Sequence, residues 1–561
     1  MVSGSGSRLK KSIGRRFGYA LGICIILAAC SAGAFVFAKP SLLSFVNDEV
    51  KKYNIEVESS DINILGKVSL KNVRIPMNDG SKVTVDRLSG GLLVPWLGGT
   101  VSLYGIFLKK GDISVAIPEL HLKSISRAAK DPAISSRTMQ LLMQINASWI
   151  KAPEIKLTVD KDGKSGKVVI RRFSLDGLKR GKIDRVTIGG VSFALAFMSS
   201  SRKQSDIQTG VLSVRNIDIA SAYDFLRGIG AEKAIVGPVA LHNLKIDLTD
   251  GKGEDLHVVV GALRSSGLSL SPAKIPPLEA IQVFLAAWYA SDLPDEHKRA
   301  ALHDLRYVLE SIAAIDVELK NATIENSELK TGFSYFEVKF RNWGQLIPEG
   351  LIISLQDFTL DMTRMQNEYV QFLREIGYEK LDLSLAGDVL WNPADHTMAL
   401  RNIAFSGKDI GEISFQGTLL DFDKGFFSGD PSRMLAAIDG SAVSELDIIL
   451  ADKGIIDHFI EWETTQINIS KQELKDSVYE IAVKSPPLLL KNYKDTQKIA
   501  DAFGAFVRDS STLHVRMVAR EKKGVSLTDF IMIQNDLSVL FNQIDLDIRT
   551  EGQIVKAAGM N

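Results

Sequence analysis

From residue 53 onward, hydrophobic and polar residues alternate with a period of two in many short runs. Residues 113–117 and 381–385 are clear examples. Such alternation places apolar side chains on one face of a strand and polar side chains on the other. Glycine-containing turns, such as those at 78–80 and 110–112, separate neighbouring runs. The pattern predicts a mainly β protein with helical insertions, built on a long, curved antiparallel sheet or groove.

Three stretches replace this alternation with helix-like patterns, at about 126–148, 278–314 and 444–509. In the second, Leu302, Leu305 and Leu309 share one helical face. The predicted regions are a basic tail 1–16, an apolar segment 17–38, a β-rich region 40–277, a helical insertion 278–314, a second β-rich unit 315–443 and a helical and β region 444–561.

One nonapeptide occurs twice. Residues 225–233 read FLRGIGAEK and residues 372–380 read FLREIGYEK, with identity at seven of nine positions. In each copy a short helix ending at glycine leads into strands. We interpret the pair as the trace of a duplication that would make two related β units, with chance similarity of helix-to-strand turns as the alternative.

The first forty residues contain a basic cluster followed by an apolar run. Five Lys and Arg residues lie within 1–16 without an acidic residue, and the 22 residues 17–38 carry no charge. At 1.5 Å per residue a helix of that length spans the roughly 30 Å hydrocarbon core of a bilayer. We expect the basic end in the cytoplasm, the helix to end at Lys39-Pro40, and residues from about 39 onward across the membrane.

The same segment permits two other interpretations. Residues 27–30, Leu-Ala-Ala-Cys, resemble a lipobox that would be lipidated at Cys30, and residues 36–38 resemble a signal-peptidase site. The apolar run continues for several residues after Cys30, which favours an uncleaved anchor. All three interpretations export the rest of the chain.

Composition removes several function classes. Lys and Arg total 67, as do Asp and Glu, so there is no net charge to attract nucleic acid. The two cysteines, Cys24 and Cys30, both lie in the apolar segment, and the eight histidines include no H-E-x-x-H pair. We therefore expect no enzyme, no cofactor and no metal. Residues 151–185 have eleven basic and five acidic side chains, which either form solvated hairpins or meet anionic lipid headgroups.

The N-terminal part resembles a known family. After the apolar segment come FVN at 45–47, YNIEV at 53–57 and ILGKVSLKNVRI at 64–75. Together with VTVDRL at 83–88 and GTVSLYGI at 99–106, they resemble the opening of the AsmA-like family over about residues 15–120. The resemblance implies an inner-membrane anchor, a periplasmic β-groove with an apolar inner face, and a role in lipid transport or outer-membrane integrity.

These observations predict a bacterial inner-membrane protein that shields lipid acyl chains on an apolar β-face. The alternative is a periplasmic scaffold or assembly factor that docks envelope proteins, with helices plugging the sheet. Whether the apolar face is open is left undecided by the sequence. The residues expected to face lipid are Val68, Leu70, Val101, Leu103, Phe193, Leu195, Phe197, Ile413 and Phe415.

Overall fold

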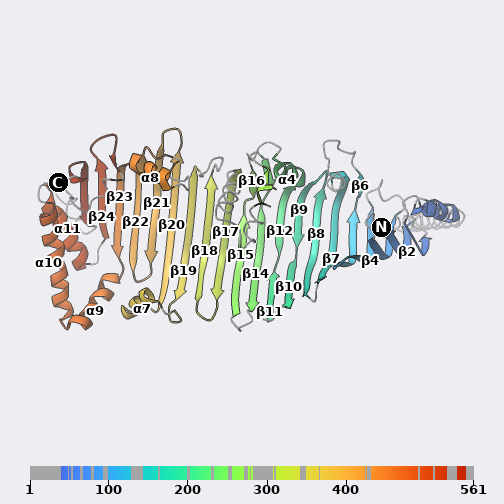
Figure 1. Ribbon diagram of the computed structural model, residues 1–561, viewed down its shortest axis with the longest axis horizontal. Helices are drawn as coiled ribbons and strands as arrows, with labels where there is room; N and C mark the ends of the chain where they lie inside the picture. The colour runs from blue at the N-terminus through green and yellow to red at the C-terminus, as the bar shows by residue number, and fades with distance from the viewer. Residues whose placement is uncertain are drawn as a thin grey trace, which may run out of the picture. The chain divides into compact units, whose positions relative to one another are not determined.

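The chain is mainly β, with antiparallel strands and a smaller number of helices (Figure 1). It divides into two compact units, Met1–Phe197 and Met198–Asn561. The computed structural model describes residues 39–48, 50–51, 55–63, 67–76, 81–91, 99–127, 143–161, 164–198, 202–228, 233–249, 255–270, 276–277, 279–281, 283, 308, 311–341, 349–365, 367–423, 425, 431–490, 493, 495–509, 512–526, 528 and 540–550.

Unit 1 is a sheet in which most strands pair with their neighbours in sequence. Strands β1 to β5 follow one another, β5 then pairs with β7, and β8 pairs with β7, β9 and β10. The strands are β1 (Ser59–Ile62), β2 (Lys67–Pro76), β3 (Lys82–Gly91), β4 (Thr100–Lys110), β5 (Ile113–Lys123), β6 (Ser126–Arg127), β7 (Ile145–Lys161), β8 (Lys164–Leu178), β9 (Lys182–Ile188) and β10 (Gly190–Met198).

A helix covers the first strands of unit 1. Residues 39–48 and 50–51 are helical, so helical structure continues past Pro40, where the sequence suggested that it ends. Its apolar side chains, among them Leu42 and Val46, pack on a buried cluster that contains Ile62 and Val73. Burying such side chains stabilises the unit by roughly 1.5–3 kcal/mol each.

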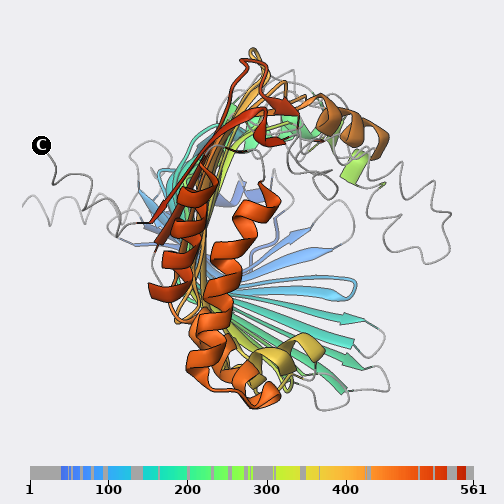
Figure 2. The ribbon, with the colours of Figure 1, turned by 90° about the vertical axis from the view of Figure 1, so that its left-hand side faces the viewer.

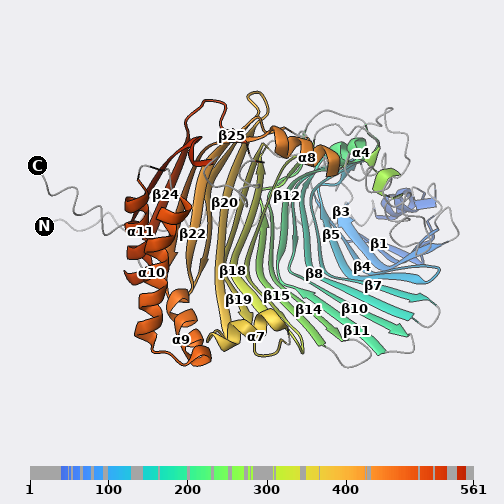
Figure 3. The ribbon, with the colours of Figure 1, turned by 60° about the vertical axis from the view of Figure 1, so that its left-hand side comes forward.

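Within unit 2, antiparallel pairing joins a longer series of strands, from β14 through β15 and β17 to β24 and β26 (Figure 3). Its strands are β11 (Arg202–Thr209), β12 (Leu212–Asp218), β13 (Lys233–Val236), β14 (Val239–Thr249), β15 (Asp255–Ser265), β16 (Leu268–Leu270), β17 (Ile312–Glu325), β18 (Lys330–Arg341), β19 (Gly350–Asp361), β20 (Lys380–Asn392), β21 (Thr397–Gly407), β22 (Gly411–Leu420), β23 (Ala442–Asp452), β24 (Thr512–Ala519), β25 (Val525–Ser526) and β26 (Ile544–Thr550).

The helices of unit 2 interrupt this series at its connections. They are α4 (Ile219–Leu226), α7 (Glu368–Glu375), α8 (Pro431–Gly440), α9 (Ile455–Ile467), α10 (Lys471–Leu489) and α11 (Thr496–Asp509). Helix α10 begins with a capping box between Ser470 and Glu473, which satisfies otherwise unpaired N–H groups. In Figure 2, α7, α8 and α10 lie on one side of the strands of unit 2.

Residues with positive φ recur in the middle of the long strands. Asn321, Asp357 and Asn402 have φ values near 50°, and each lies where the register shifts or skips. Leu355 faces Leu385, whereas Phe358 faces the residue two before Leu385, so β19 carries one extra residue in a β-bulge. The bulge keeps both apolar side chains on one face, because residues two apart in a regular strand point the same way.

All three predicted helical stretches contain residues that form strands in the structure. In 126–148, the described residues 126–127 and 145–148 are strand, and only 143–144 are helical. In 278–314, most residues lie outside the described ones, and 312–314 belong to β17. The region 444–509 opens with strand β23 before its three helices. Each correction has the same cause, since pairing with a neighbouring strand overrides a local helical pattern.

The repeated nonapeptide does form matching elements. Helices α4 and α7 each precede a strand that begins at the last residue of the repeat, Lys233 or Lys380. A glycine with positive φ follows each helix, Gly228 after α4 and Gly377 after α7. The predicted anchor 17–38 lies outside the described residues, and among the residues that are described no helix is long and apolar enough to cross a bilayer.

Candidate functional site

One apolar side chain per strand forms a continuous row across unit 2. Directly opposed residues in antiparallel strands lie on the same face of the sheet. The row, called the apolar ladder here, consists of Leu212, Leu241, Leu263, Leu319, Phe336, Leu355, Leu385, Phe405, Ile413, Leu450 and Leu513. Ten steps of roughly 4.8 Å give it a length of about 48 Å.

The ladder is exposed to solvent on β21 and β22, half-buried on the strands before them, and buried on β24. Phe405 is 44% exposed and Ile413 is 38% exposed. Leu513, two strands beyond Ile413 on the same row, is 1% exposed, because it packs in a buried cluster with Ile499 and Ala502 of α11 and with Leu490, which directly follows α10. Exposed large apolar side chains that line up in this way mark a surface for an apolar partner.

Other helices cover only the margins of the same face. Helix α7 packs on Leu360 and Leu381 near one end of the strands. Trp391 and Met398 form a separate buried cluster with Phe422, just before α8. The ladder residues of β15 to β22 belong to neither cluster. The face is therefore bordered by helices and remains half-exposed along its centre.

The opposite face carries charges. Lys320 forms an ion pair with Glu318 at 2.9 Å, and Lys339 forms one with Glu337 at 2.6 Å. Partial burial, together with the neighbouring Glu337, raises the pKa of Tyr335 to about 12, so this phenol stays neutral at physiological pH. The sheet of unit 2 thus has one apolar and one charged surface.

The predicted lipid-facing residues of unit 2 lie on the apolar face. Ile413 is a ladder residue, and Phe415 lies beside it, paired with Ile403 and Ile448 and half-buried. Sequence reasoning missed Phe405, because the bulge at Asn402 shifts the alternation between Leu400 and Phe405 by one residue. The asparagine at the shift was the available signal, since Asn tolerates positive φ better than most residues.

The predicted residues of unit 1 are placed differently. Val68 and Leu70, which were expected to face lipid, are buried beneath the helical residues 39–48 and 50–51. Val101, Leu103 and Phe193 are half-buried. Phe193 ends a second apolar row that runs through Val83, Leu108, Val115, Leu157 and Val168. The side chains of Leu195 and Phe197 lie outside the described residues.

A serine, a histidine and a glutamate meet on unit 1. The Ser102 hydroxyl lies 2.8 Å from Nδ1 of His121, and Nε2 of His121 lies 2.9 Å from Glu119. The trio has the order of a catalytic triad. Strand β4 is paired on both sides, however, so its own N–H groups bond within the sheet and do not supply an oxyanion hole at Ser102. These contacts serve as cross-strand polar contacts.

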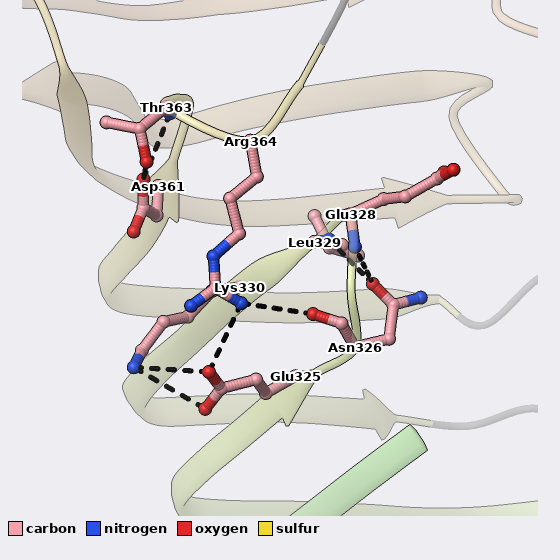
Figure 4. Close-up of polar contacts among 8 residues, drawn as sticks. All are labelled: Glu325, Asn326, Glu328, Leu329, Lys330, Asp361, Thr363 and Arg364. Carbon is pink, nitrogen blue, oxygen red and sulfur yellow. Dashed lines mark hydrogen bonds and ion pairs between the residues drawn. The ribbon is translucent and has the colours of Figure 1, made fainter. Parts of the chain in front are cut away.

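A second polar cluster joins the β17–β18 turn to the end of β19 (Figure 4). Glu325 accepts from Arg364 at 3.3 Å and pairs with Lys330 at 3.4 Å. Asp361 accepts from the backbone and hydroxyl of Thr363, and these hydrogen bonds hold the pKa of its carboxyl below the ordinary value. Both carboxylates are committed to structural contacts that fix this edge of the sheet.

An apolar cavity of about 270 Å³ lies between the C-terminal helices and the last strands of unit 2. Its walls include Leu489, Phe503, Val515, Met517, Leu546 and Ile548. The sequence pattern marked none of these as a site, because the cavity arises from the packing of α10 and α11 on β24 and β26. Among the described residues, no group of acidic, His or Cys side chains is arranged to hold a metal.

Comparison with known proteins adds one finding. A family model described as an uncharacterized protein matches residues 404–551. That segment runs from β21 to just past β26 and contains every residue that lines the cavity. No curated protein and no solved structure matches the chain.

Proposed function

We propose that this protein binds and shields lipid acyl chains on the apolar face of unit 2, without catalysing a reaction. The observation that carries the proposal is the ladder, an unbroken apolar row about 48 Å long whose centre is half-exposed. One leaflet of a bilayer provides roughly 15 Å of hydrocarbon, half of the ~30 Å core. The ladder therefore exceeds the length of a single acyl chain about threefold.

The physical reason is the hydrophobic effect. Each Å² of apolar surface removed from water contributes about 25 cal/mol. The aligned, half-exposed side chains of the ladder offer such surface to a ligand while the protein stays folded. Peptide ligands would add polar backbone groups that need hydrogen-bond partners, and the ladder offers none. Hydrocarbon chains fit this face best.

The cellular setting is part of the proposal. The basic tail 1–16 and the uncharged segment 17–38 support a single-pass anchor in the bacterial inner membrane, with residues from about 39 onward in the periplasm. The resemblance to the AsmA-like family supports a role in lipid transport or outer-membrane integrity. A reporter enzyme fused after residue 60 is expected to be active in the periplasm, and cytoplasmic activity would refute this placement.

The binding proposal is tested by the lipid content of the purified full-length protein. Mass spectrometry of extracts is expected to detect phospholipid at a fixed stoichiometry after detergent exchange. The double variant Phe405→Ser/Ile413→Ser should lose most of it, because both side chains lie on the open ladder. Gln416→Ser, on an exposed position of β22, is the matched control and should keep it. Lipid-free wild-type protein, or equal loss in the control, would refute the proposal.

A scaffold for envelope proteins is the second candidate, and one observation favours it. Ile481, Leu488 and Leu489 on α10 are 59–66% exposed. Apolar side chains on a helix surface suit protein docking. In-cell crosslinking from residue 481 that captures a defined protein partner would support the scaffold, whereas capture of lipid alone would refute it.

A further inference from the structure

The apolar cavity lies where the apolar face meets the C-terminal helices. Val515 and Met517 of β24 and Leu546 and Ile548 of β26 form its sheet side. Helices α10 and α11 form the opposite wall, with Leu489 and Phe503 among the lining residues. The cavity is therefore part of unit 2 and sits at the covered end of the ladder.

One apolar row leads from the open face into the cavity, and a second apolar pair lies beside it. Phe415 is paired with Ile448, which is paired with the cavity residue Val515. One step along the strands, Leu446 is paired with the cavity residue Met517. None of Phe415, Ile448 and Leu446 is buried. A chain that lies on the open face therefore meets apolar surface continuously until it reaches the cavity.

The cavity lining offers no polar group to a ligand. All of its lining side chains are apolar. The backbone N–H and carbonyl of Leu546, on the last strand, are already paired: the Tyr493 hydroxyl accepts from the Leu546 N–H at 2.8 Å and donates to the Leu546 carbonyl at 3.2 Å. A headgroup or a peptide would lose its hydrogen bonds here, and a water molecule would have too few hydrogen-bond partners to bind stably.

We propose that this cavity holds the methyl end of one lipid acyl chain, so that bound lipid points its tail at the C-terminal helices. The inference rests on the proposed function and adds a direction to it. Engineered apolar cavities of about 150 Å³ in another protein bind benzene, so about 270 Å³ accommodates a short terminal hydrocarbon segment. The rest of the chain then lies on the open ladder.

Photo-crosslinking of the full-length protein tests the orientation. Two fatty acids serve as probes, one with a diazirine next to the methyl end and one with a diazirine next to the carboxyl group. The methyl-end probe is expected to label peptides within 486–506, 513–517 and 540–548, and the carboxyl-end probe to label β19 to β22. Because this map comes from the wild-type protein, it requires no variant to fold.

Matched cavity-filling variants sharpen the test. Val515→Phe fills the cavity, and Val211→Phe adds the same volume at an exposed position outside the ladder and the cavity. Val515→Phe should lower methyl-end labelling of the cavity peptides about tenfold, the loss expected from expelling roughly two methylene groups. Val211→Phe should leave that labelling unchanged. Circular dichroism verifies that both variants are folded.

The outcomes separate the two proposals. Labelling by both probes along the ladder, with none in the cavity peptides, would overturn the orientation and leave acyl-chain binding intact. Unchanged cavity labelling in a folded Val515→Phe protein would also overturn the orientation. Absence of saturable labelling anywhere on unit 2 would overturn lipid binding and the orientation together.

Discussion

Ile413 and Leu513 belong to the same apolar ladder, yet they differ in solvent exposure. Ile413 is 38% exposed on β22, and Leu513 is 1% exposed on β24. Both are aliphatic residues on the same face of the sheet, separated by one strand. Leu513 is covered by residues of α11 and by Leu490 just after α10, whereas Ile413 is not part of that cluster. Alternation along a strand therefore determines which face a side chain takes, and distant segments determine whether that face is covered.

The largest expected effect separates these two residues directly. Leu513→Ala should lower the free energy of unfolding by about 2–5 kcal/mol, because it leaves a hole beneath α11. Ile413→Ala should lower it by about 1 kcal/mol or less, since the side chain already contacts water. Urea unfolding followed by circular dichroism measures both. Equal losses would mean that the open part of the ladder is packed as tightly as its covered end.

The faces of the sheet could be predicted from sequence wherever the alternation is uninterrupted, as in 381–385. Prediction failed at Phe405, because the bulge at Asn402 depends on pairing with β20 and β22 and leaves only an asparagine as a local trace. For Val68 and Leu70 the sequence did not indicate the cover, because the helix that packs on them lies almost wholly within the region 40–277, which was expected to be β-rich. Both failures are non-local, since neither cover nor register is encoded in the strand itself.

The parts of the candidate site also differ in how far the sequence could predict them. Ile413 and Phe415 could be placed on an apolar face from two residues and their polar neighbours. The cavity could not, because its walls come from four elements that are brought together only by folding. A pattern within one element cannot indicate a space between several.

The second prediction removes the cover. Gly504 lies in α11 where a Cβ atom would be 2.7 Å from Cγ2 of Val483 and 2.9 Å from the ring of Tyr479. Gly504→Leu should push α11 away from α10 and destabilise the protein by about 1–3 kcal/mol. Faster proteolysis within 471–509 and weaker urea resistance are the expected results. Gln497→Leu, at an exposed position of the same helix, is the control, and an equal effect there would contradict the tight α10–α11 contact.

The third prediction concerns the polar group at the covered end. Tyr493→Phe removes the hydroxyl that bonds both backbone groups of Leu546 and leaves them without that partner. The free energy of unfolding should fall by about 1–2 kcal/mol. Tyr369→Phe is the control, because Tyr369 is 81% exposed. If both variants unfold at the same urea concentration as wild type, the Tyr493 hydroxyl does not secure the last strand.

The smallest expected effect is a pH dependence of the cover. Lys475 forms an ion pair with Asp457 at 2.6 Å and joins α10 to α9, and this contact holds the pKa of the Asp457 carboxyl below its ordinary value. A carboxyl whose pKa is lower in the folded state stabilises at neutral pH, and its contribution disappears as the pH falls through that lowered pKa, below about 4.

Because Asp457 is 46% exposed, solvent screening limits its contribution to about 1 kcal/mol or less. The Asp457→Asn variant should therefore be slightly less stable than wild type at pH 7 and equally stable near pH 3. Urea unfolding at the two pH values, with Asp476→Asn as the control on α10, measures the difference. A gap between Asp457→Asn and wild type that persists unchanged at pH 3 would show that the residue stabilises α9 through packing and hydrogen bonding that survive protonation, and the cover would then be insensitive to pH.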